Sequence, residues 1–438
     1  MQQINLGMIG GGTVGCGVFE ALQRNGGLLA SRLGIGINLL KIAVKAFDEP
    51  RPVAIPLSYM TTEWQSVVND PQVQMVAELA GGTTVARTMV LTALKLGKPV
   101  IIANKALLST HGEELFAAAI KHQTNIYYEA SVAGGIPIIK SLREGFIGNQ
   151  ITHVYGIVNG TCNYILTRMK LEGADFDVVL KDAQKLGYAE AEPSLDVDGH
   201  DSVHKIGILA TLAHGFWVNP KRIHVEGIRS ITKLDILFAG QLGYTIKLLG
   251  VIKKSPKPNG HNGSRVQVSV CPTLIPNHHL LANVNQVFNA VFVRGDVVGD
   301  TLFYGRGAGK DPTASAVLSD LADAALDLKY GSHHRIPPFA PRDPHGEVLP
   351  MDEVVSRYYV RFTVVDRPGT LAKIAAIFGA GNIGISSVIQ PEGHEGKSVP
   401  LIFMTHEAPN AAMTQALAQI SQLEVNQAAP VMFRVENF

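Results

Sequence analysis

Five carboxylates and a lysine gather in one short stretch of the chain, GYAEAEPSLDVDGHDSVHK, which runs from Gly187 to Lys205. Asp201 and Lys205 are four residues apart and open a predicted helix, so both side chains project from the same helix face. The strongly apolar residues 206–212 follow, which indicates a largely buried helix and argues against an exposed salt bridge, the usual role of such a pair. Because desolvation lowers the pKa of a lysine toward a useful range, this pair is a candidate for acid–base chemistry.

The glycine run GGGTVG is a second feature with chemical meaning. It follows the apolar run 4–9 and precedes a helical pattern at 14–22, which predicts strand, turn and helix. Gly10, Gly12 and Gly15 occupy the glycine positions of a dinucleotide-binding fingerprint, in which the helix N-terminus offers N–H groups to a pyrophosphate. A purely structural glycine turn is the alternative. The expected cofactor contacts are Gly10, Gly12, Thr13, Val14 and Gly15.

Two lysines lie near the ends of runs that are predicted to be parallel strands. A second strand that binds the ribose of NAD ends in an acid, whereas the run 39–47 carries Lys45 and the first acid is Asp48. This favours NADP over NAD, unless Lys45 is merely solvated. Lys105 follows the run 100–103, at the edge of the sheet where ligands gather, and would meet a phosphate, the nicotinamide or a substrate oxygen. An ordinary surface lysine is the alternative for Lys105.

Alternating strands and helices must position these residues. Apolar runs that alternate with helical stretches such as 84–96 predict an α/β Rossmann nucleotide-binding domain over residues 1–140. Mixed segments over 141–330 predict an α+β domain that carries the catalytic stretch. Five prolines mark 331–350 as a linker, and the pattern beyond it predicts a separate βαββαβ module over 351–438.

Composition excludes several classes of function. Lys plus Arg total 38 and Asp plus Glu total 37, so no net field favours nucleic acid or a membrane surface. Cys16, Cys162 and Cys271 are widely spaced, which argues against a disulfide framework or a structural zinc site and favours a reducing compartment. The start of the chain has no signal-peptide pattern, and no apolar run reaches the roughly 18 residues of a membrane span. We therefore expect a cytoplasmic protein.

Four segments resemble the homoserine dehydrogenases in the same order, namely NKA (104–106), GIVNGTCNYILTRM (156–169), GYAEAEP with its DVDGHDSVHK continuation (187–205) and LDILFAGQLGYTIKLLGVI (234–252). The resemblance covers residues 1 to about 330. It departs from the family at Glu192, where Asp, Asn or Ser usually precedes the proline. It implies reversible, NAD- or NADP-dependent interconversion of L-aspartate 4-semialdehyde and L-homoserine in threonine, methionine and isoleucine biosynthesis. The second domain would then also serve dimerisation.

The resemblance implies a role for each site residue. Lys205 would transfer the substrate proton, and Asp201 would orient it. Glu190 and Asp196 would bind the amino-acid substrate, with Lys105 at the junction of cofactor and substrate. The late glycine segment would return the chain to the cofactor at Gly309. Main-chain carbonyls of a glycine-rich turn would hold a monovalent cation, usually sodium, unless the turn is a plain chain reversal. Its expected ligands are Glu129, Val132, Gly134 and Ile136.

The C-terminal stretch VDRPGTLA, residues 365–372, resembles the first loop and helix start of ACT domains, and Gly381-Asn382-Ile383 follows at the end of the predicted helix. This implies a C-terminal ACT domain that binds a small amino acid, L-threonine by preference, where two copies meet. A feedback-regulated homodimer or homotetramer is expected.

Two other functions compete with this interpretation. A semialdehyde dehydrogenase of a different type would need a nucleophilic cysteine, but Cys162 has no histidine neighbour in NGTCNY to activate it. A non-catalytic amino-acid sensor that retains a Rossmann unit is the second competitor, and the intact pair Asp201 and Lys205 argues against it.

Overall fold

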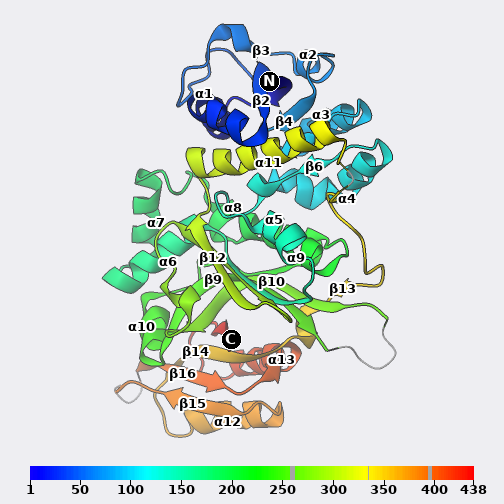
Figure 1. Ribbon diagram of the computed structural model, residues 1–438. Coiled ribbons are helices and arrows are strands. Elements are labelled where there is room, and N and C mark those ends of the chain that lie inside the picture. Colours follow the sequence, from blue (N-terminus) through cyan, green and yellow to red (C-terminus); the bar gives the residue numbers. More distant parts are fainter. Residues whose placement is uncertain (257–261, 334, 393–396) are drawn as a thin grey trace.

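The computed structural model describes residues 1–256, 262–333, 335–392 and 397–438. Residues 257–261 of the predicted second domain, 334 of the predicted linker and 393–396 of the predicted C-terminal module lie outside the described residues. Figure 1 shows three tiers, with the N-terminal elements in blue and cyan at one end, a central sheet in green, and the C-terminal elements in orange at the other end. The candidate site residues belong to the first two tiers.

The first tier is a six-stranded parallel sheet in the order β3-β2-β1-β4-β5-β6. This order is that of a doubly wound nucleotide-binding sheet, so the expected Rossmann fold is confirmed. Its strands are β1 (Gln2–Ile9), β2 (Ile35–Ala43), β3 (Met60–Thr61), β4 (Met75–Glu78), β5 (Val100–Ile102) and β6 (Ile126–Tyr127). Its helices are α1 (Thr13–Leu33), α2 (Gln65–Val68), α3 (Val85–Lys95) and α4 (Lys105–Lys121). The predicted strand 39–47 is wrong at both ends, because β2 begins at Ile35 and ends at Ala43.

A late helix completes this tier. Helix α11 (Lys310–Tyr330) packs along α1, and both are buried on the shared face. The approach is close at Gly17, where an added Cβ would lie 2.6 Å from the carbonyl oxygen of Lys310. In Figure 1 the helix, in yellow, lies directly beneath the blue domain. The chain therefore returns to the nucleotide-binding fold after β12, before it adds β13 to β18 to the second sheet.

The second sheet is mixed and contains twelve strands, with the main path β12-β11-β7-β9-β10-β18-β14-β16-β15. Its strands are β7 (Ile151–Ile157), β8 (His224–Val225), β9 (Tyr244–Ser255), β10 (Arg265–Pro276), β11 (Phe288–Gly295), β12 (Gly299–Arg306), β13 (Glu347–Val348), β14 (Val355–Val365), β15 (Ile385–Ile389), β16 (Ser398–Thr405), β17 (Ala408–Pro409) and β18 (Val431–Val435). The helices beside it are α5 (Ile138–Lys140), α6 (Gly160–Glu172), α7 (Phe176–Lys185), α8 (Ser194–Val197), α9 (His200–His214), α10 (Lys233–Gln241), α12 (Thr370–Ala380) and α13 (Asn410–Ser421).

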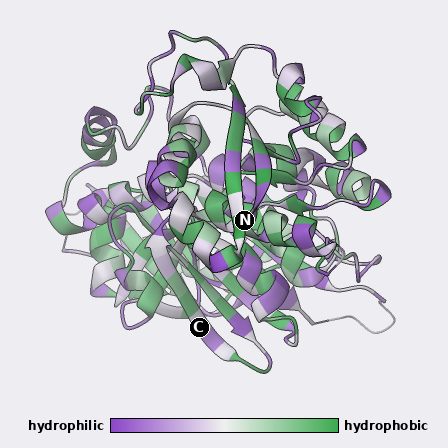
Figure 2. Cartoon of the chain, turned by 45° about the horizontal axis from the view of Figure 1, so that its top comes forward, coloured by the Kyte–Doolittle hydropathy of each residue, from purple (hydrophilic) through white to green (hydrophobic). Residues whose placement is uncertain are grey.

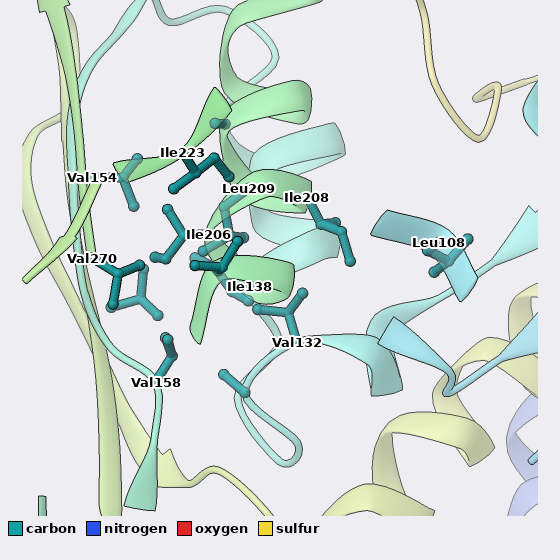
Figure 3. Packing of buried hydrophobic residues seen from close by; sticks show 14 of the residues in the cluster. Leu108, Val132, Ile138, Val154, Val158, Ile206, Ile208, Leu209, Ile223 and Val270 are labelled. Atoms are coloured by element: carbon teal, nitrogen blue, oxygen red, sulfur yellow. The ribbon is translucent and has the colours of Figure 1, made fainter. Parts of the chain in front are cut away.

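Helix α9 lies between the two sheets and is buried along almost its whole length. Figure 3 shows Ile206 facing Val154 and Val270 of the central sheet, while Ile208 points toward Leu108 of α4. The apolar stretch 206–212 therefore packs on both sides, as the sequence predicts. This packing holds the N-terminal turn of α9 where the two tiers meet.

The C-terminal residues show the expected βαββαβ order, with the longer strands in the spatial order β18-β14-β16-β15, the helices α12 and α13, and the two-residue strand β17 paired with β14. The expected separation from the rest of the chain is wrong. Strand β18 pairs with β10, so the central sheet continues into the C-terminal tier without a break. Arg361 of β14 also donates two hydrogen bonds to Asp235 of α10, whose side chain is fully buried.

The proline-rich stretch is packed against the catalytic part rather than free. Tyr128 donates a hydrogen bond to the carbonyl of Pro338, and Arg342 donates to the carbonyls of Leu212 and Ala213 at the end of α9. Phe339 is buried. Proline content identifies a segment with little regular structure, here the two-residue strand β13 among the described residues, but it does not reveal which carbonyls that segment covers.

Figure 2 shows hydrophobic stretches in green along the strands and on helices, and hydrophilic stretches in purple on helices and connecting segments. Among the described residues, no helix has both the length and the apolar character needed to cross a membrane.

Candidate active site

The pair Asp201 and Lys205 forms as the spacing predicts, at the start of α9. The ammonium of Lys205 donates to Asp201 Oδ2 at 2.6 Å and to the carbonyl of Val158 at 2.7 Å. Both side chains are buried, with 5% of Asp201 and 8% of Lys205 exposed. Burial opposes the charge of Asp201, but Lys205 and Lys105 outweigh it and hold the pKa of this carboxyl well below its ordinary value. The pair is therefore an ionised carboxylate bound to a lysine.

Lys105 reaches the same carboxylate from the first tier. It is the first residue of α4, whose N-cap Asn104 accepts a hydrogen bond from the backbone N–H of Leu107. Its ammonium lies 3.1 Å from Asp201 Oδ1. About a third of the Lys105 side chain is exposed, so it can still meet a ligand. Asp201 thus bridges two lysines that lie far apart in the sequence.

Asp196 and Asn159 complete this polar cluster. Asp196 lies on the short helix α8, and Asn159 is the N-cap of α6. The amide of Asn159 donates to Asp196 Oδ1 at 2.7 Å and to Asp201 Oδ2 at 3.0 Å. Burial, together with the nearby charge of Asp201, raises the pKa of Asp196. The sequence analysis missed Asn159, although an asparagine directly before a helical pattern is a recognised capping signal.

These residues face one cavity of about 460 Å³. Its lining consists of Lys105, Val158, Asn159, Gly160, Thr161, Gly187, Tyr188, Asp196, Asp201, Lys205, Val287, Asn289, Arg306, Gly307, Ala308 and Gly309. Five of the residues singled out from the sequence therefore meet here. Glu190 does not, because its side chain is exposed and outside the lining; Tyr188, which sequence reasoning did not select, lines the cavity instead.

The glycine turn has the shape that a dinucleotide requires. Gly10 has a φ of 109°, which only glycine adopts without strain, and a Cβ on Gly15 would lie 2.1 Å from the carbonyl oxygen of Gly10. A Cβ on Gly12 would meet nothing within 4 Å, so space is open in front of the turn. No side chain caps α1, which leaves the first-turn N–H groups of Thr13 and Val14 facing that space. These residues fit a pyrophosphate.

The loop after β2 contains a better-placed cation than Lys45. Lys45 lies two residues beyond the strand and is exposed. Arg51 folds back, donates to the carbonyls of Ala46 and Phe47, and places its Nε 3.4 Å from the position of a Cβ on Gly11. That Nε is buried and has no hydrogen-bond partner within the described part of the chain. Sequence reasoning stopped at the strand end and so missed Arg51.

The predicted cation turn begins with a short 3₁₀ segment, Glu129–Ser131, and reverses through Ala133 and Gly134, which both have positive φ. The N–H of Glu129 donates to Asp320 of α11. Its carboxylate accepts hydrogen bonds from two N–H groups at the start of α5, and burial raises its pKa to about 7. The carbonyls of Val132 and Gly134 are buried, and no described hydrogen bond ends on either of them. Two unpaired carbonyls are compatible with a cation, whereas the carbonyls of Glu129 and Ile136 already accept hydrogen bonds from the N–H groups of Val132 and Ile138.

Cys162 is unsuited to nucleophilic catalysis. It is fully buried, its thiol donates to the carbonyl of Asp196 at 3.2 Å, and burial raises its pKa well above the ordinary value. Since the thiolate is the reactive form, this environment argues against a cysteine-based semialdehyde dehydrogenase.

Comparisons with known proteins agree along the whole chain. Residues 10–129 match the model of the homoserine dehydrogenase NAD-binding domain, and residues 137–322 match the homoserine dehydrogenase model. Homoserine dehydrogenase of Pseudomonas aeruginosa is 42% identical, with 100% of this chain and 99% of the relative covered. That of Neisseria gonorrhoeae is 40% identical, with the same coverage.

Solved structures show the same likeness. A homoserine dehydrogenase from Thiobacillus denitrificans superimposes with a TM-score of 0.93 at 42% identity, covering 100% of this chain and 99% of that chain. A hyperthermophilic archaeal homoserine dehydrogenase in complex with NADPH has a TM-score of 0.62 at 26% identity and covers 74% of this chain and 98% of its own. The full-length matches include the C-terminal tier, beyond the part on which the sequence resemblance rested.

Proposed function

Since the chain belongs to the homoserine dehydrogenase family of oxidoreductases, we propose that its 460 Å³ cavity performs the NAD(P)-dependent interconversion of L-homoserine and L-aspartate 4-semialdehyde. The observation that carries this proposal is the meeting of Lys105, Asp201 and Lys205 in one cavity, which Gly309 connects to the helix packed along α1. When bound, the nicotinamide supplies the hydride acceptor or donor.

The side chains of the cavity transfer the substrate proton and orient the substrate. Lys205 takes the hydroxyl proton as the neutral amine during oxidation and becomes an ammonium, which returns that proton during reduction; Asp201 and the carbonyl of Val158 accept hydrogen bonds from its nitrogen and fix its position. Asp196 binds the substrate ammonium, and Lys105 lies where cofactor and substrate meet. Glu190 stays a candidate substrate ligand that would have to turn inward, because its side chain is exposed.

The reduction direction tests the assignment of the substrate. Purified protein with L-aspartate 4-semialdehyde and NADPH should form L-homoserine, identified by mass spectrometry, in step with the loss of absorbance at 340 nm. A product other than homoserine, or consumption of NADPH without the aldehyde, would refute the assignment.

We also propose that NADP is the preferred cofactor and that Arg51 and Lys45 bind its 2′-phosphate. Charge-assisted hydrogen bonds to phosphate are each worth about 1.5–3 kcal/mol. Arg51→Ala should therefore raise the KM for NADP about 10- to 100-fold and leave the KM for NAD nearly unchanged; Lys45→Ala should do the same to a smaller extent, because Lys45 is exposed. Steady-state kinetics with both cofactors measure this difference. An equal rise in the KM for NADP and for NAD would mean that these cations stabilise the loop and do not bind the 2′-phosphate.

The turn at 129–136 is proposed to hold sodium through the carbonyls of Glu129, Val132, Gly134 and Ile136. The two unpaired buried carbonyls support this site. The Glu129 side chain has a separate task, because its hydrogen bonds tie the turn to the start of α5.

The C-terminal tier is proposed to be an ACT domain in a feedback-regulated homodimer or homotetramer that works in the cytoplasm in threonine, methionine and isoleucine biosynthesis. The βαββαβ order supports this assignment. The loop at 366–371 and Asn382 lie at opposite ends of α12, roughly 15 Å apart along the helix axis, so one amino acid would contact both segments only where they come from two different copies.

The effector prediction follows from that placement. Coupling between sites typically amounts to about 1–3 kcal/mol, so millimolar L-threonine should lower the activity several-fold. Removal of the whole tier is a poor test, because it would uncover β10 and leave Asp235 buried without Arg361. Asp366→Ala should instead abolish the response without changing the uninhibited kcat. Insensitivity of the intact protein, together with no threonine binding by calorimetry, would exclude threonine as the effector.

A further inference from the structure

Asn159 connects two carboxylates that the proposed mechanism uses for different tasks. Its amide donates one hydrogen bond to Asp196, the proposed ammonium ligand, and one to Asp201, the partner of Lys205. We infer that Asn159 is a positioning residue that holds the substrate-binding carboxylate and the proton-transfer pair in one fixed arrangement. This inference rests on the proposed function.

The orientation of the Asn159 amide is determined by the helix that it caps. Its Oδ1 accepts a hydrogen bond from the backbone N–H of Cys162 at 2.8 Å, so its NH₂ group must face away from α6. The two N–H bonds of that group then point to Asp196 and Asp201, one each. With only 5% of Asn159 exposed, water has little access to replace these bonds. Only the amide side chains of Asn and Gln can accept a hydrogen bond from the helix N-terminus and also donate two hydrogen bonds. Gln is too long to cap the helix from this position.

The two carboxylates depend on Asn159 to different degrees. Asp201 also has two lysine partners, whereas Asp196 takes part in no ion pair among the described residues. The groups that face Asp196 are Asp201 and Lys205 on α9, Thr161 and Cys162 on α6, and Lys105 across the cavity on α4. Burial and Asp201 raise the pKa of Asp196, while Asn159 lowers it. Loss of the amide should therefore make Asp196 take up a proton at a higher pH.

Asn159→Ser separates positioning from helix capping. Serine caps a helix about as well as asparagine, so the variant should fold and keep the wild-type melting temperature within a few degrees. It cannot reach both carboxylates. We expect a 10- to 100-fold fall in kcat/KM for homoserine, an unchanged KM for the cofactor, and a shift of the acid limb of the pH profile to higher pH. Asn159→Asp keeps the cap but places a third negative charge against the pair, so its loss should be larger.

Asn410→Ser is the matched control. Asn410 is also a buried asparagine at the start of a helix, with 6% exposed, and it bonds to a charged side chain, Arg434. It lies outside the cavity, so its replacement should leave the pH profile for homoserine unchanged.

The outcomes separate this inference from the proposed function. Suppose that the wild type oxidises homoserine and that Asn159→Ser has the same kcat/KM and the same acid limb in its pH profile. The inference is then overturned, and Asn159 only caps α6. The inference would also be overturned if Asn159→Ser impaired the kinetic constants for homoserine and for the cofactor equally. The same holds if Asn410→Ser shifted the acid limb of the pH profile as Asn159→Ser does. A wild type without homoserine-dependent activity would instead refute the proposed function.

Discussion

Replacement of Lys205 by methionine should lower kcat for homoserine oxidation by about 10² to 10⁴, the usual contribution of a positioned acid or base. Methionine nearly preserves the volume of a side chain that is only 8% exposed, so the packing of α9 should survive. The effect should appear mainly in kcat, because proton transfer stabilises the transition state more than the bound substrate.

Cofactor binding is the control for the Lys205 variant. Lys205 contacts Asp201 and Val158 but no residue of the glycine turn, so NADPH should bind as in the wild type in a fluorescence titration. A Lys205→Met enzyme with near wild-type kcat would exclude Lys205 as the proton-transfer group. Loss of NADPH binding would show that the substitution disturbs more than the proton step.

Asp201→Asn should lower kcat by about 10- to 1,000-fold and also destabilise the fold. The variant leaves Lys205 buried without its carboxylate, and breaking a buried pair costs about 3 kcal/mol. Because the folded pKa of Asp201 is lowered, its contribution to stability is present above the ordinary value of 3.8 and is lost as the pH falls through the folded pKa. The difference in urea unfolding free energy between wild type and variant should therefore stay constant from about pH 5 to 8 and vanish only in strong acid.

Lys105→Met is a useful comparison for Asp201→Asn. It removes the partially exposed lysine at 3.1 Å and keeps the buried pair, so it should affect activity with little loss of stability. If Asp201→Asn had wild-type kinetics and lowered stability alone, Asp201 would be a structural ion-pair partner and not an orienting group.

Local geometry explains which parts of the site the sequence predicts. Asp201 and Lys205 share a helix face because helical side chains four apart are neighbours, and Gly10 to Gly15 describe one turn. The contact of Lys105 with Asp201 depends on how α4 packs on α9, which no spacing within either helix contains. Sequence position could place Lys105 only at the sheet edge.

The misses also have physical causes. β2 ends at Ala43, so the loop after it carries Lys45 into solvent and brings Arg51 back to the glycine turn. Asn159 acquires its second task only where α6, α8 and α9 converge. The docking of the C-terminal tier depends on β18 pairing with β10, and the proline content of residues 331–350 carries no information about that edge.

The most direct test of the central claim is an absorbance trace at 340 nm with purified protein, L-homoserine and either NADP or NAD. The structure predicts a rise that requires both homoserine and cofactor, saturates with homoserine, and falls at least about 100-fold when Lys205→Met enzyme, saturated with cofactor, replaces the wild type. No homoserine-dependent rise with either cofactor would contradict the assignment of this cavity as a homoserine dehydrogenase site. A rise of equal rate in the two enzymes would contradict the role given to Lys205.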